Sequence, residues 1–509
     1  MEQPWAFFGM AAFTVLMSAI DSTIVAVALP TLVHDLDTTL VWAAWMITAY
    51  ALAQTVMLPL AGKLAEQFGQ MRVFVGSVML FTVGSLLCAV APNIYVLIGC
   101  RILQAIGGGG FFPSATGIVA HLFPKTRSRM IGLFASIFPI GGILGPNLGG
   151  LVIEHFGWRL TFMINVPIGI IVTLLLIRQA LAPPEASPST SRKIDWLGTG
   201  LFALSILSVL VALTLLGNNP TFISSPVFWV LLVASCLLLF LFVKQEQRAP
   251  EPILDLSLVT RAPFLVANVF NFLAGACFTG FFSFIPYYAT VQYGMGPLES
   301  GAILTPRSLM MIAVSTTISF ILPRIGYRRP MLAGMICVTG ALSLLGVGFQ
   351  EVRIGSLTLD PLIPLLLIMS LSGLGMGMLI PASNNANLDM LPQRAAVLSG
   401  IRGLFNNTGG VLGTALIVLW LALHEDKAAG LQNVFTTLGL IMLLTIPLAF
   451  LIPDFAMDRR RAEQRAARER ADAELAAARE PLASETVGAP APPPDRQEEH
   501  DEPATVRHV

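Results

Sequence analysis

Two ionisable side chains of opposite charge lie deep inside apolar segments near the start of the chain. Asp21 is an acid well inside the first apolar block, and Arg101 is the only charged residue between Arg72 and Lys125. A charge at the centre of a membrane helix costs about 2.5 to 3.5 kcal/mol on insertion scales, so such residues are usually paired and functional. A carboxyl group can release its proton when a guanidinium approaches and regain it when the cation withdraws. We interpret the two as a proton-coupling pair; a purely structural ion pair is the alternative.

The positions of Asp21 and Arg101 within their blocks place them at the same depth. The first block runs outward and ends near Leu29, whereas the fourth runs inward from about Ile94. At 1.5 Å per residue, both side chains then lie roughly 10 to 12 Å below the outer surface. The two groups are therefore expected to meet.

The composition shows which solvent surrounds these charges. Of the 509 residues, 55% are hydrophobic and only 12% are charged, and the mean hydropathy is +0.75. A spanning helix needs about 20 apolar residues. Fourteen blocks meet this requirement, at about residues 5–29, 41–60, 73–91, 94–120, 130–153, 161–182, 195–216, 226–243, 262–288, 300–323, 331–349, 361–387, 398–423 and 433–452. The sequence predicts an all-α integral membrane protein, and nothing in it indicates nucleic-acid binding.

The distribution of Lys and Arg predicts the orientation. These residues are concentrated in the loops on the side of the N-terminus, and the opposite loops hold only Arg159, Arg353 and Lys427. By the positive-inside rule, both termini are expected in the cytoplasm. The first block opens with Glu2 and is too long for a signal peptide, so we expect it to remain as an anchor. The predicted location is the cell (inner) membrane, with multiple spans.

An internal repeat predicts the domain organisation. GGILG at 141–145 recurs as GGVLG at 409–413, and Pro30 and Gly69 recur as Pro286 and Gly326. The first six helices therefore correspond to the last six, with the same direction through the membrane. The expected parts are an N-terminal six-helix bundle at 1–182, a linker with two inserted helices at 183–252, a C-terminal six-helix bundle at 253–453, and a charged cytoplasmic tail, expected to be disordered, at 454–509. The repeat places Cys277 and Met369 at the positions of Asp21 and Arg101.

Five motifs carry a resemblance to a known family. They are AIDSTIVAVALP at 19–30, GKLAEQFGQMR at 62–72, RILQAIG at 101–107, GGILGPNLGG at 141–150 and WRLTFMINVPIG at 158–169. Over about residues 5–453 the chain resembles the major facilitator superfamily, and within it the fourteen-helix drug:proton antiporters of the EmrB/QacA type. This resemblance implies two pseudo-symmetric six-helix bundles plus two inserted helices. It also implies export of amphipathic drugs or toxic compounds by alternating access.

The loop motif between the second and third blocks is interpreted as a conformational latch. Gly62 and Gly69 permit a tight turn, and Glu66 and Arg72 can pair or bind helix ends. An ordinary positive-inside loop is the alternative. The family motif usually carries more basic residues than this chain does at Gln67 and Gln70. The separate motif RILQAIG in the fourth helix contains Gln104 and Gly107 as well as Arg101.

The fifth helix carries what the family resemblance identifies as the antiporter motif. Its small residues let helices pack backbone to backbone, and its proline removes a hydrogen bond and kinks the helix. The motif residues are Gly141, Gly142, Gly145, Pro146, Asn147, Gly149 and Gly150. We predict a gate or a substrate path here, against tight packing alone.

Arg307, Asn147 and Asn271 are the candidate substrate contacts. Arg307 lies about seven residues inside the outer surface, where a cavity role and snorkelling to the interface are equal alternatives. Arg402 lies close to the cytoplasm, so we expect it to snorkel. Asparagines such as Asn271 can line a cavity or bond neighbouring helices. Because a buried arginine occupies the later helices, neutral or weakly acidic amphipaths fit better than dications.

The sequence therefore predicts a proton-coupled exporter of amphipathic drugs, with a role in antibiotic resistance. No phosphate-binding loop appears, so a proton gradient rather than ATP or a cofactor is the expected driving force. No metal site and no enzymatic constellation stand out. A dedicated exporter of one metabolite and a non-transporting sensor remain alternatives. The resemblance also allows a periplasmic membrane-fusion adaptor and an outer-membrane channel as partners.

Overall fold

The computed structural model describes most of the chain. The described residues are 4–123, 130, 137–181, 195–249, 252, 254, 256–348, 352–354, 357–390, 395–454, 457 and 469. Residues 1–456 form one compact unit, and residues 457–509 form a second. The side chain of Glu66, which belongs to the predicted latch, is not among the described parts of the structure.

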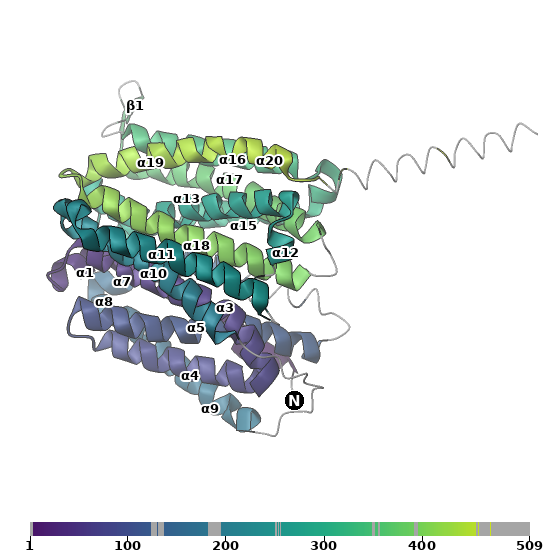
Figure 1. Cartoon of the computed structure of the whole chain (residues 1–509). Helices are drawn as coiled ribbons and strands as arrows, with labels where there is room; N and C mark the ends of the chain where they lie inside the picture. The colour runs from purple at the N-terminus through teal and green to yellow at the C-terminus, as the bar shows by residue number, and fades with distance from the viewer. Residues whose placement is uncertain are drawn as a thin grey trace, which may run out of the picture. The chain divides into compact units, whose positions relative to one another are not determined.

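Long helices dominate the first compact unit, as expected where the backbone must satisfy its own hydrogen bonds in lipid. Figure 1 shows these helices lying side by side. In the first part of the chain they are α1 (Pro4–Asp35), α2 (Leu40–Ala43), α3 (Trp45–Phe68), α4 (Gln70–Ala89), α5 (Ile94–Leu122), α7 (Ile137–Phe156), α8 (Trp158–Met163) and α9 (Asn165–Leu181). The two inserted helices follow as α10 (Trp196–Asn218) and α11 (Pro226–Arg248), with the short 3-10 helix η2 (Pro220–Ser224) between them.

The second half repeats this arrangement. It contains α12 (Leu256–Val259), α13 (Ala262–Tyr293), α14 (Pro297–Ala302), α15 (Thr305–Ile325), α16 (Arg328–Val347), α17 (Leu362–Asp389), α18 (Ala395–Ala422), α19 (Lys427–Leu444) and α20 (Ile446–Leu451). A hairpin of two short antiparallel strands, β1 (Val352–Ile354) and β2 (Leu357–Leu359), separates α16 from α17. The sequence did not predict this hairpin.

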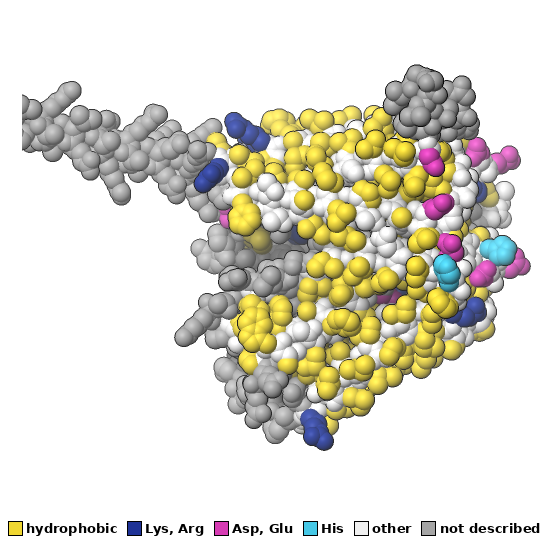
Figure 2. All heavy atoms as spheres, turned by 180° about the vertical axis from the view of Figure 1, so that it is seen from behind, with side chains coloured by type: hydrophobic (Ala, Val, Ile, Leu, Met, Phe, Trp, Pro, Cys, Tyr) yellow, Lys and Arg dark blue, Asp and Glu magenta, His cyan; other side chains and the backbone are white. Residues whose placement is uncertain are grey.

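Thirteen candidate membrane spans occur in the described part of the chain. They match the predicted blocks except the fifth, and α7, a helix of 20 residues, occupies that block. Figure 2 shows apolar side chains over the middle of the surface, with acidic side chains and histidines gathered at one end. This distribution fits a protein that crosses a bilayer, and it confirms the predicted all-α membrane fold.

The same helix pairs pack together in both halves of the first unit. In the first half α1 packs on α7, α3 and α4 on α5, and α4 on α9; in the second half α13 packs on α18, α15 and α16 on α17, and α16 on α19. The predicted repeat is therefore visible in the packing. We call the end of the bundle at which α1 begins the near end, and the end at which α1 finishes at Asp35 the far end.

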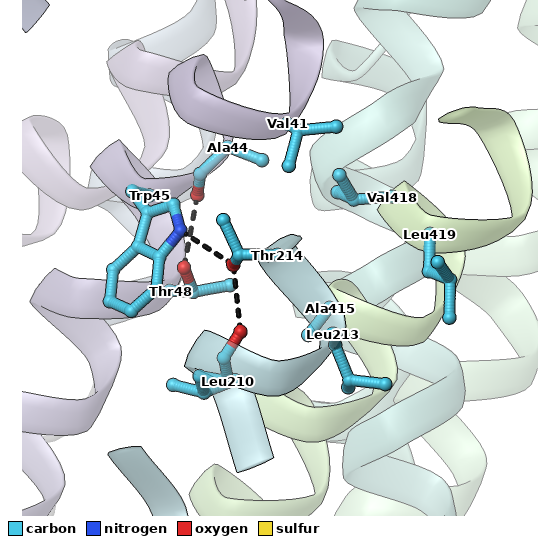
Figure 3. Close-up of a pocket in the computed structure, with 10 residues that line it drawn as sticks. All are labelled: Val41, Ala44, Trp45, Thr48, Leu210, Leu213, Thr214, Ala415, Val418 and Leu419. Carbon is cyan, nitrogen blue, oxygen red and sulfur yellow. Dashed lines mark hydrogen bonds between the residues drawn. The ribbon is translucent and has the colours of Figure 1, made fainter. Parts of the chain in front are cut away.

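The inserted helix α10 contacts both halves towards the far end. The indole Nε1 of Trp45 on α3 donates a hydrogen bond of 2.9 Å to the hydroxyl of Thr214 on α10. Leu419 of α18 packs against the cluster that contains Leu216 of α10. Residues of α3, α10 and α18 line a cavity of about 10 Å³, which has room for about one water molecule (Figure 3). The inserted helix α10 thus bridges the two halves.

Candidate functional site

Asp21 and Arg101 form a buried ion pair between α1 and α5. Arg101 Nη1 lies 2.6 Å from Asp21 Oδ2, and the two side chains are 1% and 0% exposed. Gln104, one turn along α5, accepts a 2.6 Å hydrogen bond from the same guanidinium nitrogen and donates one of 2.9 Å to Asp21 Oδ1. The contact expected from the depths of the two residues is present. It belongs to a network in which Gln104 is the third member.

Two polar residues that the sequence analysis did not single out complete the network. Asn165, at the start of α9, donates a hydrogen bond of 3.0 Å to Asp21 Oδ1. The amide of Gln104 also donates to the hydroxyl of Ser85 on α4, at 2.7 Å. Asn165 lies within the motif at 158–169, where an amide in an apolar block was the available signal. The carboxylate of Asp21 therefore receives hydrogen bonds from two helices other than its own.

Arg101 also contacts aromatic rings and the backbone. Its guanidinium carbon lies 4.0 Å from the ring centre of Tyr50 and 5.5 Å from that of Phe162. Its Nε is 3.4 Å from the carbonyl oxygen of Met46. Because rings stabilise a cation through their electron-rich faces, Arg101 is held as a charged group within the protein.

Glycines let α4 and α5 approach closely beside the network. A Cβ at Gly107 would lie 2.5 Å from the backbone nitrogen of Phe81, and one at Gly84 would lie 2.7 Å from the Cα of Gln104. Side chains at these positions would therefore push the helices apart. Gly107, predicted only as a motif residue, permits the contact that brings Ser85 to Gln104.

The glycines of the antiporter motif form two stripes on α7. A Cβ at Gly141, Gly145 or Gly149 would clash with α1, at Ala19, Thr23 and Ile24 respectively. The second half repeats this stripe at Gly409 and Gly413, which meet the backbone of α13. Close packing of the first and fifth helices is thus common to both halves.

The other stripe, Gly142, Pro146 and Gly150, faces the second half of the chain. A Cβ at Gly150 would lie 2.5 Å from the carbonyl oxygen of Pro297, and Gly301 lies against the carbonyl oxygen of Pro146. Ser308 on α15 donates a hydrogen bond of 3.3 Å to the carbonyl oxygen of Gly142. The motif therefore forms part of the contact between the halves.

Asn147 and Glu154 extend this contact along α7. The amide of Asn147 donates a hydrogen bond of 2.6 Å to the hydroxyl of Thr305 on α15. Glu154 accepts one of 3.2 Å from the backbone nitrogen of Leu298 on α14. Because α14 and the end of α7 lie at the far end, the halves are joined there. Asn147, a predicted substrate contact, already has a protein partner in this arrangement.

The latch motif is found at the near end, between α3 and α4. Gly69 separates these helices with φ of 95°, a conformation that L side chains rarely adopt. Arg72 Nε donates a hydrogen bond of 3.1 Å to the carbonyl oxygen of Ala180 on α9. In the second half Gly326 has φ of 78°, and Arg328 Nε donates to the carbonyl oxygen of Ile452. Gly62 has open space around it, so its predicted latch role stays a prediction.

A cavity of about 230 Å³ lies in the second half, among α13, α17 and α18. Asn271, a predicted substrate contact, lines it with Phe282 and Asn406. The guanidinium carbon of Arg307 lies 3.1 Å from the ring centre of Phe282. Asn271 also bonds helices together, since its side-chain oxygen accepts from Ser383 and its carbonyl oxygen from Asn406. Both roles considered for the asparagines are therefore combined in this residue.

Comparison with known proteins identifies a family model and several relatives that match most of the chain. The model of the Major Facilitator Superfamily matches residues 11–358 and 267–491. The chain is 30% identical to the multidrug transporter protein MdtP of Bacillus subtilis, over 79% of this chain and 72% of that protein. It is 30% identical to the tetracenomycin C resistance and export protein of Streptomyces glaucescens, over 82% and 76%. It is 27% identical to the riboflavin transporter RibZ of Clostridioides difficile, over 82% and 88%.

These relatives are transporters, not enzymes, and they are similar to this chain over most of its length. The family model covers both helical halves, which the packing relates to each other. By its sequence and by its helices, this chain belongs to the major facilitator superfamily of membrane transporters.

Proposed function

We propose that this transporter exports amphipathic drugs or toxic compounds from the cytoplasm in exchange for protons. The observation that carries the proposal is the buried network around Asp21, whose carboxylate contacts Arg101, Gln104 and Asn165. An ionisable group with this degree of burial in a membrane helix is a functional candidate by default. Two relatives named for drug transport or export support the choice of substrates.

The network suggests how a proton could be coupled to movement. In this arrangement the charged form of Asp21 is stabilised by one cation and two amide donors. These donors come from α5 and α9, whereas Asp21 is on α1, so a shift of α1 would weaken all three contacts together. A desolvated carboxylate without donors favours its protonated form. Proton uptake would thus accompany one position of α1, and proton release the other.

Alternating access would use the two stripes on α7. One stripe binds α7 to α1, so the two helices would move as a unit. The other touches α14 and α15 of the second half at the far end. In this proposal that contact forms when the path to the outside is closed and opens when substrate is released. The near end would be the cytoplasmic side, as the distribution of Lys and Arg predicts.

Transport by purified protein in liposomes tests the proposal. With a pH gradient imposed, the wild-type protein should drive accumulation of a fluorescent amphipathic dye, and collapse of the gradient should stop it. Asp21→Asn should abolish this gradient-driven transport while the protein stays folded and still exchanges dye between equal concentrations. Near-normal gradient-driven transport by folded Asp21→Asn protein would contradict the coupling role. The exposed Asp37, a loop acid, provides the matched control variant Asp37→Asn.

A dedicated exporter of one metabolite is the second candidate. The similarity to a riboflavin transporter favours it, because it shows that relatives of this chain include proteins named for a single compound. Growth assays with chemically unrelated toxic compounds separate the two functions, since only a drug exporter protects against several of them. An adaptor and an outer-membrane channel remain predicted partners.

A further inference from the structure

We propose that the cavity in the second half is a binding site for amphipathic organic anions, such as aromatic carboxylates. This inference specifies the substrate class of the proposed exporter and so rests on that function. It is carried by two half-buried arginines with buried Nε atoms, each next to a lining residue of an apolar cavity that no acidic side chain lines.

The body of the cavity suits a flat apolar ligand. Its volume is about 230 Å³, and aromatic and aliphatic side chains form most of the wall, with four polar side chains among them. The polar residues are Asn271, Thr279, Ser383 and Asn406. A cavity that is largely apolar with a few convergent polar groups is the usual form of a small-molecule site. Ligand binding here would need one charged group to set orientation.

Arg307 is placed to provide that charge towards the far end of the cavity. Its guanidinium stacks on Phe282, the lining residue of α13 nearest to the far end. Its Nε is buried and has no hydrogen-bond partner. A guanidinium stacked by its face keeps its edge donors available for a carboxylate. A buried unpaired donor is costly, so an anionic ligand would relieve that cost.

Arg402 provides a second cation towards the near end. It lies four residues before Asn406 on α18, so both are on the same face of the helix. Its Nε is also buried without a hydrogen-bond partner, while the residue as a whole is half-buried. The residues that line the cavity include no Asp or Glu.

Neither arginine is neutralised by the protein. Arg101 is paired with Asp21 in the other half, whereas no acid among the described residues pairs with Arg307 or Arg402. Two uncompensated cations in a desolvated region oppose the entry of a cationic ligand and favour an anion. The first half therefore holds the ion pair of Asp21 and Arg101, and the second half holds Arg307 and Arg402, which have no acidic partner among the described residues.

Three probes with one apolar body test the charge preference directly. The probes are 2-naphthoate, 2-naphthamide and 2-naphthylmethylammonium, and binding to the purified full chain in detergent is measured by calorimetry near neutral pH. We expect the carboxylate to bind about tenfold more tightly than the amide, and the ammonium to bind most weakly. Equal or tighter binding of the ammonium by the wild-type protein would overturn the proposal.

Variants identify the residues responsible. Arg307→Gln should weaken carboxylate binding about tenfold and leave amide binding within about twofold, whereas Arg307→Lys should retain part of the preference. Arg402→Gln should act in the same direction. The exposed Arg178 of α9 provides the matched control Arg178→Gln, which should change none of the three affinities. Equal weakening of all three probes by Arg307→Gln, in protein that unfolds at the wild-type temperature, would refute a direct contact.

The same measurements separate this inference from the proposed export function. Binding in detergent requires no gradient, so Asp21→Asn protein should keep the preference for the carboxylate even though its coupled transport is lost. A wild-type protein that binds the carboxylate selectively but shows no proton-driven flux would refute the export function alone.

Discussion

The amide of Asn147 on α7 donates a hydrogen bond of 2.6 Å to the hydroxyl of Thr305 on α15, and so connects the two halves of the transporter. The same surfaces also meet at Gly150, which lies against Pro297, and at Gly142, whose carbonyl oxygen accepts a hydrogen bond from Ser308. This contact is made of backbone and short polar groups without ion pairs among the described residues. Such a surface can separate and re-form with little cost in desolvated charge.

Bulk at the glycine stripe should open this contact. Gly150→Leu places side-chain atoms where a Cβ alone would lie 2.5 Å from the carbonyl oxygen of Pro297, so the closed far end becomes unfavourable. We expect faster labelling of Ser300→Cys by an impermeant maleimide, because Ser300 is 1% exposed when the contact is closed. Gly76→Leu is the control, since Gly76 has open space around it. Unchanged labelling in the Gly150 variant would show that this stripe does not form the gate.

Loss of one donor to Asp21 should weaken gradient-driven transport. Asn165→Ala removes a hydrogen bond of 3.0 Å to the Asp21 carboxylate, so the proposed coupling network is held less firmly. Dye efflux from liposomes under an imposed pH gradient should therefore slow, with smaller changes in dye affinity. Asn219→Ala, outside the network, should leave the rate in place. An unchanged rate in folded Asn165→Ala protein would contradict the assigned role of Asn165.

The attachment of α10 should depend on the bond between Trp45 and Thr214. Thr214→Val leaves the indole nitrogen of Trp45 buried without a partner, and it should lower stability by about 1 to 3 kcal/mol. Adding Trp45→Phe should cost less than the sum of the single changes, because the two residues share one interaction. Thermal unfolding of the purified proteins measures these differences. Strict additivity would indicate that the bond contributes no coupling.

Removal of the tail after residue 458 should leave transport intact. The tail has no long apolar block, and residues 457–509 form a unit separate from the helical one. Efflux by the truncated protein, normalised to the amount in the membrane, is therefore expected to equal that of the full chain. Loss of efflux at equal abundance would assign the tail a role in transport.

The position of the cut matters because Asp454 belongs to the helical unit. Its carboxylate accepts hydrogen bonds from the backbone nitrogens of Tyr327 and Arg328 at the start of α16. Asp454→Ala should therefore cost about 1 kcal/mol, as for other caps of helix N-termini. A lower unfolding temperature for Asp454→Ala, with none for the truncation, is the expected contrast.

The sequence alone determined the spans, the repeat and the depth of the central charges. Because water is absent from the bilayer core, a long apolar segment must form a helix to satisfy its backbone hydrogen bonds. The rise of about 1.5 Å per residue then gives the depth of a residue from its position in the segment. For this reason the sequence alone predicts that Asp21 and Arg101 meet. The resemblance to the family rests on motifs that lie at turns and at close helix contacts, where the backbone tolerates few residue types.

Only the tertiary structure decided which neighbours these residues meet. Depth does not specify rotation about a helix axis or the order of helices around the bundle, and both depend on the packing of all helices together. Asn165 of α9 donates to Asp21, Ser85 of α4 accepts from Gln104, and Asn147 donates to Thr305 of the other half. The burial of Arg307 against Phe282 likewise arises from contacts among α13, α15 and α17, which no single segment encodes.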